Sequence, residues 1–170
     1  MYHLTSAGQS QSARSFMNYL VTFIGTFAYT GFFPIAPATF ASFVFAVIYW
    51  VVPGGQMLVH PVVVIATAVI SVPVSTQLER RYGHDSGRIV IDEIVGMQLI
   101  LMLASPALAG LILAFFLFRF FDIVKVFPAN RSQKLPRGWG VVCDDVIAGI
   151  YSRIALVLLA IVFPRIGEFL

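Results

Sequence analysis

Two pairs of adjacent acidic residues stand just inside apolar stretches of the chain, Asp92-Glu93 and Asp144-Asp145. Neighbouring residues on a helix point about 100° apart, so at most one carboxylate of each pair faces a given point squarely. Carboxylates, with water and substrate phosphate, are the ligands that Mg²⁺ prefers. The pairs therefore predict a site for one or two Mg²⁺ ions held by Asp92, Glu93, Asp144 and Asp145. The alternative is that these acids only cap helix N-termini, where the helix dipole favours them.

A further acid lies between two cations, in the series Arg119, Asp122 and Lys125. Steps of three residues place all three on one face if the segment is helical throughout. We expect Arg119 and Lys125 to hold phosphate oxygens and to stabilise charge on a leaving alkoxide. Asp122 would bind metal or orient the two cations. The other interpretation, contact with lipid headgroups, suits the basic residues that follow, Arg131, Lys134 and Arg137.

Weaker signals lie in two polar segments. His84 and Asp85 precede Arg88 in a polar stretch before the first acidic pair. His84 has the chemistry of a general acid or a ligand, although a lone loop histidine is more often neither. Thr39 either binds phosphate or caps the helix that begins near Phe40.

Two glycines follow the acids at the same spacing. Gly96 lies four residues after Asp92, and Gly149 lies four residues after Asp145. A glycine one turn further along a helix lets either another helix or a ligand come close. Ordinary helix packing and ligand approach are equally good explanations of this pattern.

The composition is that of a membrane protein. Of 170 residues, 59% are hydrophobic and 11% are charged, and the mean hydropathy is +0.89. A soluble domain is nearer half apolar and a quarter charged, so lipid must solvate part of this surface. The net charge of +3 is small and the basic residues flank apolar runs, which speaks against a nucleic-acid partner. The single cysteine, Cys143, excludes an internal disulfide.

The apolar runs predict an all-α, polytopic membrane helical bundle with about four transmembrane helices. Residues 1–15 are expected to form a flexible N-terminal tail, and residues 16–170 a single membrane-embedded domain. The segment 16–33 contains small and hydroxylated residues, and it either spans or forms an interfacial or re-entrant helix. The four long apolar runs after it cover residues 40–52, 61–75, 89–121 and 141–163.

The third run decides on which side of the membrane the charges lie. Its 33 residues would make a helix of about 50 Å, well over the roughly 30 Å hydrocarbon core. Two short passes with a turn at Ser105-Pro106 explain it better than one long pass. Six acids then share one side with most of the cations, and the positive-inside rule makes that side cytoplasmic. These acids are Asp85, Asp92, Glu93, Asp122, Asp144 and Asp145.

Several phosphatase and nucleotide signatures are absent from the sequence. There is no phosphate-binding P-loop, no thiol-phosphatase loop, no D-x-D motif and no paired-histidine lipid phosphatase pattern. Carboxylates, cations and water remain, which favours metal-assisted hydrolysis. Two rival functions are a small ion carrier or channel subunit, since intramembrane carboxylates also mark ion pathways, and a non-catalytic scaffold that binds anionic lipid.

Four segments together resemble the bacterial phosphatidylglycerophosphatase A family. Residues 83–97 are similar to its central signature, and residues 118–128 to its Arg…Asp…Lys-Pro block. Residues 138–149 resemble its Gly-rich loop and Asp-Asp helix, and residues 30–42 its first block. The segments stand in the family's order. Within the first block this chain has Ala38 and Ala41 where the family has glycines.

The resemblance implies Mg²⁺-dependent removal of the terminal phosphate of phosphatidylglycerophosphate, giving phosphatidylglycerol. It implies a multi-pass protein of the bacterial inner membrane, with its active site facing the cytoplasm and its phospholipid substrate in the bilayer. A homo-oligomer is compatible with the sequence. The implied catalytic residues are Asp92, Glu93, Asp122, Asp144 and Asp145, and the implied substrate contacts are Thr39, Asp85, Arg119 and Lys125. We add His84 and Arg88 to the predicted substrate contacts.

Overall fold

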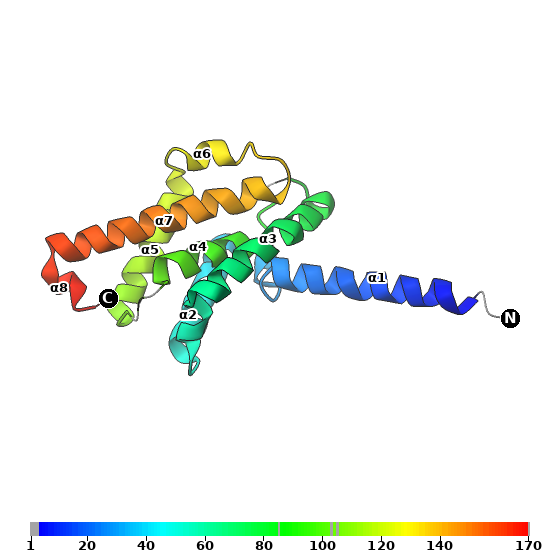
Figure 1. Cartoon of the computed structure of the whole chain (residues 1–170), viewed down its shortest axis with the longest axis horizontal. Coiled ribbons are helices and arrows are strands. Elements are labelled where there is room, and N and C mark those ends of the chain that lie inside the picture. Colours follow the sequence, from blue (N-terminus) through cyan, green and yellow to red (C-terminus); the bar gives the residue numbers. More distant parts are fainter. Residues whose placement is uncertain (1–3, 85, 103, 105, 170) are drawn as a thin grey trace.

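All regular structure in the described part of the chain is helical. The computed structural model describes residues 4–84, 86–102, 104 and 106–169. Its elements are α1 (Leu4–Gly25), η1 (Thr30–Phe32), α2 (Pro37–Val51), η2 (Gly55–Val59), α3 (Pro61–Tyr82), α4 (Ile91–Leu101), α5 (Leu108–Val124), α6 (Ala129–Ser132), α7 (Gly138–Val162) and α8 (Pro164–Gly167). The all-α prediction is therefore confirmed (Figure 1).

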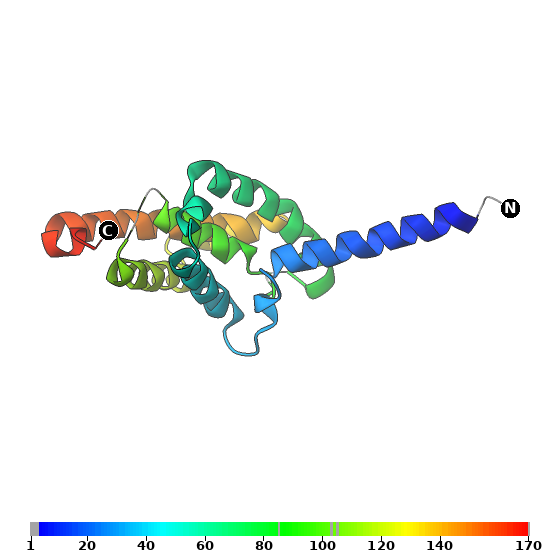
Figure 2. The same ribbon diagram turned by 90° about the horizontal axis from the view of Figure 1, so that it is seen from below.

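Helix α1 projects away from the other helices, as both orthogonal views show (Figures 1 and 2). Only its C-terminal part packs on the bundle, where Val21 joins a small apolar cluster with Leu78 of α3. Residues 4–15, expected as a flexible tail, belong to this helix. Residues such as Ala, Gln, Ser and Arg are compatible with a helix, so this segment continues the helix of the apolar residues that follow it.

Helix α4 is the buried centre of the bundle. Ten of its 11 residues are buried. Met97, Ile100 and Leu101 pack in one core cluster with Phe45 of α2, Phe118 of α5 and Leu156 of α7. A helix that is apolar nearly all round needs such surroundings, and neighbouring helices supply them here.

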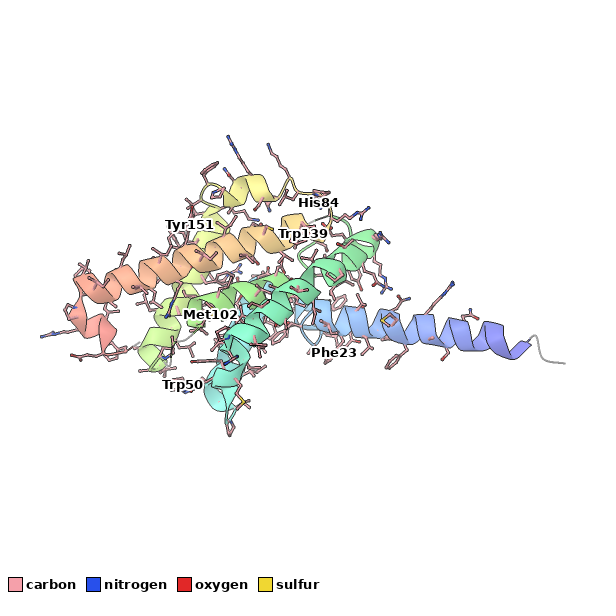
Figure 3. The ribbon with its side chains drawn as sticks, in the orientation of Figure 1. Phe23, Trp50, His84, Met102, Trp139 and Tyr151 are labelled. Carbon is pink, nitrogen blue, oxygen red and sulfur yellow. The ribbon has the colours of Figure 1, made fainter. Side chains whose placement is uncertain are left out.

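The connections gather the helix ends into two groups. At one end, the Tyr49 hydroxyl donates to the carbonyl of Ala104 (3.1 Å), and the Ala107 amide donates to the carbonyl of Phe169 (2.8 Å). At the other end, the Gly138 amide at the start of α7 donates to Thr76 Oγ1 of α3 (3.0 Å). Figure 3 shows Trp50 near the first end and His84 near the second. The starts of α4 and α7 therefore lie at the same end as the C-terminal part of α3.

The predicted helix boundaries differ from the structure at the end of α3. Helix α3 continues to Tyr82, past the point near Ser75 where we expected a polar loop. Gln, Leu, Glu and Arg favour helix, and the helix stops only at Gly83, whose φ of 95° is left-handed. The third apolar run is divided as predicted, into α4 and α5.

The expectation of about four transmembrane helices is not confirmed. Among the described residues, two helices are long and apolar enough to cross a membrane, α3 and α7. Helices α2 and α5 have 15 and 17 residues. Helix α4, with 11 residues, is about 16 Å long, roughly half of the hydrocarbon core.

Candidate active site

Helices α4 and α7 touch through their glycines. A Cβ on Gly149 would lie 2.8 Å from the carbonyl oxygen of Gly96, and a Cβ on Gly96 would lie 3.1 Å from that of Asp145. The close approach predicted at these glycines is thus made by a helix. The side chain of Arg153, one turn after Gly149, donates to the carbonyl of Ile100 (3.1 Å). The two helices therefore run in the same direction, with both acidic pairs at the same end.

Three carboxylates from the two helices meet at this end. Asp92, Glu93 and Asp145 each offer an oxygen, and these oxygens lie within 4.8 Å of one another. The three residues are 5%, 8% and 3% exposed, so water screens their charges little. We call these three residues the carboxylate cluster.

The cluster has buried oxygens without a partner. Asp92 Oδ1 and Glu93 Oε2 are buried and accept no hydrogen bond. Burial raises the pKa of Asp92 well above its ordinary value, and the charges of Glu93 and Asp145 raise it further. Burial also raises the pKa of Glu93, to about 7. Buried oxygens that accept no hydrogen bond require an explanation. A hard cation such as Mg²⁺, bound by these carboxylate oxygens, would provide one.

Asp122 and Arg119 of α5 adjoin the cluster. The carboxyl of Asp122 lies within hydrogen-bonding reach of Asp145. Its Oδ2 is 2.9 Å from Arg119 Nη1, but the angle is wrong for a hydrogen bond, and both Nε and Nη1 of Arg119 are buried without an acceptor. A guanidinium with two spare N–H groups beside buried carboxylates can receive an anion such as phosphate.

Asp144 has a different partner from the other member of its pair. The Lys125 ammonium donates to Asp144 Oδ2 (2.8 Å). Lys125 ends α5 in a left-handed conformation, with φ of 48°. Of the four predicted metal ligands, three thus form the carboxylate cluster, while Asp144 is drawn toward a cation that we predicted to contact phosphate.

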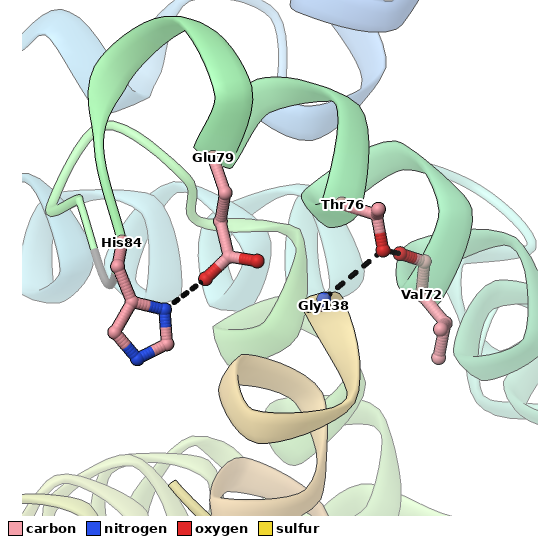
Figure 4. A network of polar contacts seen from close by, with 5 residues as sticks. All are labelled: Val72, Thr76, Glu79, His84 and Gly138. Carbon is pink, nitrogen blue, oxygen red and sulfur yellow. Dashed lines mark hydrogen bonds and ion pairs between the residues drawn. The ribbon is translucent and has the colours of Figure 1, made fainter. Parts of the chain in front are cut away.

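The loop between α3 and α4 carries the remaining predicted contacts. His84 is exposed, and its Nδ1 lies 2.5 Å from a carboxylate oxygen of Glu79 (Figure 4). The exposed Arg88 guanidinium lies over the rings of Phe32 and Tyr82, at 5.5 and 5.3 Å from their centroids. Asp85 lies outside the described residues. The structure therefore gives His84 and Arg88 partners in or beside the loop.

The first block of the sequence forms the start of α2. Thr39 is half-buried in the first turn of this helix. Ala41 is fully buried in the core cluster, so its methyl group fills space between helices. Ala38 accepts a hydrogen bond from Ser42 through its carbonyl (3.0 Å).

Two charged residues, Arg153 and Glu79, are more buried than we expected from the sequence. Arg153 is half-buried within α7, where it binds the C-terminal end of α4. An arginine inside an apolar helix needs a partner, and that signal was present in the sequence. The Glu79 side chain is only 9% exposed and faces His84. Glu79 follows an apolar run whose helix we expected to end earlier, so nothing in the sequence marked it.

Comparisons with known proteins show the family to which the chain belongs. The profile of the family described as "Phosphatidylglycerophosphatase A" matches residues 23–160. A Bacteroides thetaiotaomicron protein named "Putative phosphatidylinositol-3-phosphatase" is 35% identical over 148 residues, which cover 82% of this chain and 92% of that protein. Two proteins are named "Phosphatidylglycerophosphatase A". The Haemophilus influenzae protein is 47% identical over a stretch that covers 43% of this chain and 46% of that protein. The Escherichia coli protein is 29% identical over a stretch that covers 72% of this chain and 73% of that protein. No solved structure matches the chain.

Proposed function

Since the chain belongs to the phosphatidylglycerophosphatase A family and is therefore a phosphatase, we propose that it hydrolyses phosphatidylglycerophosphate with Mg²⁺ as cofactor. The products are phosphatidylglycerol and inorganic phosphate. One observation carries the proposal. Asp92 and Glu93 have buried carboxylate oxygens that accept no hydrogen bond, and the Arg119 guanidinium, whose charge acts on Glu93, has buried N–H groups that donate none. A cation and a phosphate would complete both sets.

The carboxylates are the proposed metal ligands. Asp92, Glu93 and Asp145 would hold the metal, and Asp144 is the fourth predicted ligand. When bound, Mg²⁺ supplies positive charge to phosphoryl oxygens and lowers the pKa of water. Glu93 offers a proton acceptor at the site, since burial raises its pKa to about 7.

Phosphate binding falls to the cations. Arg119 would place its free N–H groups on two phosphate oxygens, in the forked geometry that guanidinium offers. Lys125 would share its charge between Asp144 and the phosphate, stabilising charge that moves to the leaving alkoxide. Asp122 would orient Arg119, because the two side chains already form an ion pair of 2.9 Å. Thr39 and the loop residues His84, Asp85 and Arg88 would contact the outer part of the headgroup.

The proposed location is the bacterial inner membrane, with several passes and the active site at the cytoplasmic face. The apolar helices α3 and α7 support membrane insertion. The ends of α3 and α5 that lie toward the site carry Arg80, Arg81, Arg119 and Lys125. Basic residues are enriched in cytoplasmic segments of membrane proteins, which favours this orientation. The acids meet at one end of the bundle and do not follow one helix at successive depths, which argues against an ion carrier.

The first test is phosphate release from phosphatidylglycerophosphate by detergent-purified protein, in Mg²⁺ and then in EDTA. We expect phosphate release in Mg²⁺ but not in EDTA. We expect Asp145→Asn to abolish the release while the protein still folds. Equal release in EDTA would exclude the metal. No release under either condition would exclude this substrate.

Phosphatidylinositol 3-phosphate is the second candidate substrate. The Bacteroides relative that is 35% identical over most of the chain is named for that lipid. Both lipids carry a phosphomonoester on a diacylglycerol anchor, so the same cluster serves either reaction. Running both lipids in parallel decides between them by the ratio of kcat/KM.

A further inference from the structure

An apolar groove separates the outer faces of α2 and α5. Its volume is about 240 Å³. Phe43, Val47 and Trp50 line it from α2, and Leu111, Ile112 and Phe116 from α5. Lined by apolar side chains alone, this α2–α5 groove suits hydrocarbon and offers a polar ligand nothing to bind.

The groove has one end toward the site and one end away from it. Helices α2 and α5 run in opposite directions, because the end of α2 is tied to the start of α5 through the Tyr49–Ala104 hydrogen bond. The groove end that contains Trp50 and Leu108 is thus the distant end. Phe43 and Phe116 form the near end.

The lining of α5 leads directly to the ionic residues. Its groove residues recur at helical spacing from Leu108 through Ile112 to Phe116, and Arg119 and Asp122 continue the same stripe. On α2, the position one turn before Phe43 is Thr39. One helix face therefore changes from wholly apolar to ionic at the point where it reaches the carboxylate cluster.

A second apolar cavity of about 480 Å³ lies on the other side of α2. Ile91, Ile94 and Gln98 of α4 form one of its walls. The opposite face of α4 meets α7 at Gly96. Because α4 stands between this cavity and Asp145, the cavity does not lead to the cluster in the way that the α2–α5 groove does.

We propose that the α2–α5 groove binds an acyl chain of the phospholipid phosphomonoester whose phosphate occupies the site at Arg119. This inference rests on the proposed function. Phe116 lines the near end of this uncharged groove and Arg119 lies one helical turn further along α5, so the surface is complementary to a molecule with an apolar tail and an anionic head. The groove would hold the part of the acyl chain nearest the headgroup, because the eight helical steps from Phe43 to Val51 span only about 12 Å.

The test fills the groove without touching the core. Val47 is 41% exposed and lines the groove. Val69 of α3 is 66% exposed and lies away from it, so Val69→Trp is the matched control for Val47→Trp. Each variant is assayed with long-chain phosphatidylglycerophosphate and with its deacylated, water-soluble headgroup phosphomonoester.

We expect Val47→Trp to lower kcat/KM for the long-chain lipid by about tenfold or more, since even single methylene groups in an apolar pocket can matter that much. Hydrolysis of the soluble headgroup compound should be unchanged, and Val69→Trp should match the wild type with both substrates. Equal kinetics of the two variants, or equal losses on both substrates in Val47→Trp, would overturn the groove inference. Absence of phosphate release by the wild type would instead overturn the proposed function.

A binding experiment gives a readout independent of turnover. The wild type is labelled with a phosphonate analogue of the lipid that carries a photoreactive group on its acyl chain. We expect labelled peptides from α2 and α5, and we expect excess unlabelled lipid phosphomonoester, but not phosphatidylcholine, to suppress the label. Labelling spread evenly over the exposed faces of α2, α5 and α7, or label that phosphatidylcholine suppresses equally, would overturn the inference.

Discussion

The segment 83–97 consists of two halves that the sequence presents as one motif and the structure separates. In its first half, His84 and Arg88 are exposed; His84 faces Glu79, and Arg88 lies over two aromatic rings. Its second half opens α4, where Asp92 and Glu93 are buried with oxygens that accept no hydrogen bond. Ionisable side chains thus meet opposite environments within ten residues.

The two halves differ in whether their polar groups already have partners within the protein. Polar groups with protein partners are already satisfied in the free protein and have less to gain from a ligand. Buried groups without partners are destabilising unless something completes them. We therefore expect the buried half to govern turnover and the exposed half to govern affinity for the headgroup.

The largest effect is expected for Asp92→Asn. The amide keeps the shape but removes a charge from the carboxylate cluster, and kcat should fall by at least about a hundredfold, since even the partners of metal ligands are worth about ten- to a hundredfold. Glu168→Gln, an acid-to-amide change in an exposed residue near the opposite end, is the control. Phosphate release measures both variants, and activity of Asp92→Asn within a few-fold of the control would remove the cluster from the mechanism.

The glycines allow the same substitution in each half. In Gly96→Ala the new Cβ would lie 2.2 Å from a ring carbon of Phe118, which is fully buried. The helices must separate, so we expect a loss of about 1–3 kcal/mol of unfolding free energy and a lower kcat. In Gly87→Ala the nearest atom is 3.8 Å away, and the change should stay within about 0.5 kcal/mol.

Thermal unfolding in detergent compares the two alanine variants. If Gly96→Ala unfolded at the wild-type temperature with full activity, the close packing of α4 against α5 and α7 would not position the carboxylates. A marked destabilisation by Gly87→Ala would show that the loop is as tightly constrained as the buried half.

Part of this arrangement could be predicted from the sequence, and the limits are physical. Alternating apolar runs with polar turns predict the direction of each helix, so the gathering of acids at one end follows from the order of the runs. Which acid of a pair faces inward does not follow. Asp144 and Asp145 differ by about 100° of rotation, and only the packing of α7 against α4 and α5 directs one to the cluster and the other to Lys125.

Helix ends were harder to predict than helix directions. The polar residues after Ser75 looked like a loop, but they extend α3 to Tyr82 and bring Thr76 against the first turn of α7. The hydrogen bond from Gly138 to Thr76 joins residues 62 positions apart. No local pattern contains such a contact, because it depends on how two helices cross.

An intermediate effect is expected at Lys125, which ends α5 and lies outside the segment 83–97. Lys125 is 31% exposed and donates to Asp144, which is 6% exposed. Lys125→Gln removes the cation from this bond and from the proposed phosphate site, and kcat/KM should fall by about tenfold, less than for a metal ligand. Lys125→Arg should restore part of the loss because it keeps the charge. If Lys125→Gln and Lys125→Arg were equally impaired, the position of the lysine ammonium group, and not its charge alone, would determine kcat/KM.

The smallest effect is expected for His84→Gln in the exposed half. Its side chain is 63% exposed, and an ion pair at the surface is worth about 0–1 kcal/mol, so KM should rise by less than about fivefold and kcat should stay unchanged. Full Michaelis curves with the lipid substrate separate the two constants. A fall in kcat comparable to that of Asp92→Asn would bring the loop into the chemistry, because a group that only holds the headgroup cannot alter the step that follows binding. The division between the two halves would then be wrong, and His84 with Glu79 would have to be treated as an acid–base pair that reaches the phosphate once the lipid is bound.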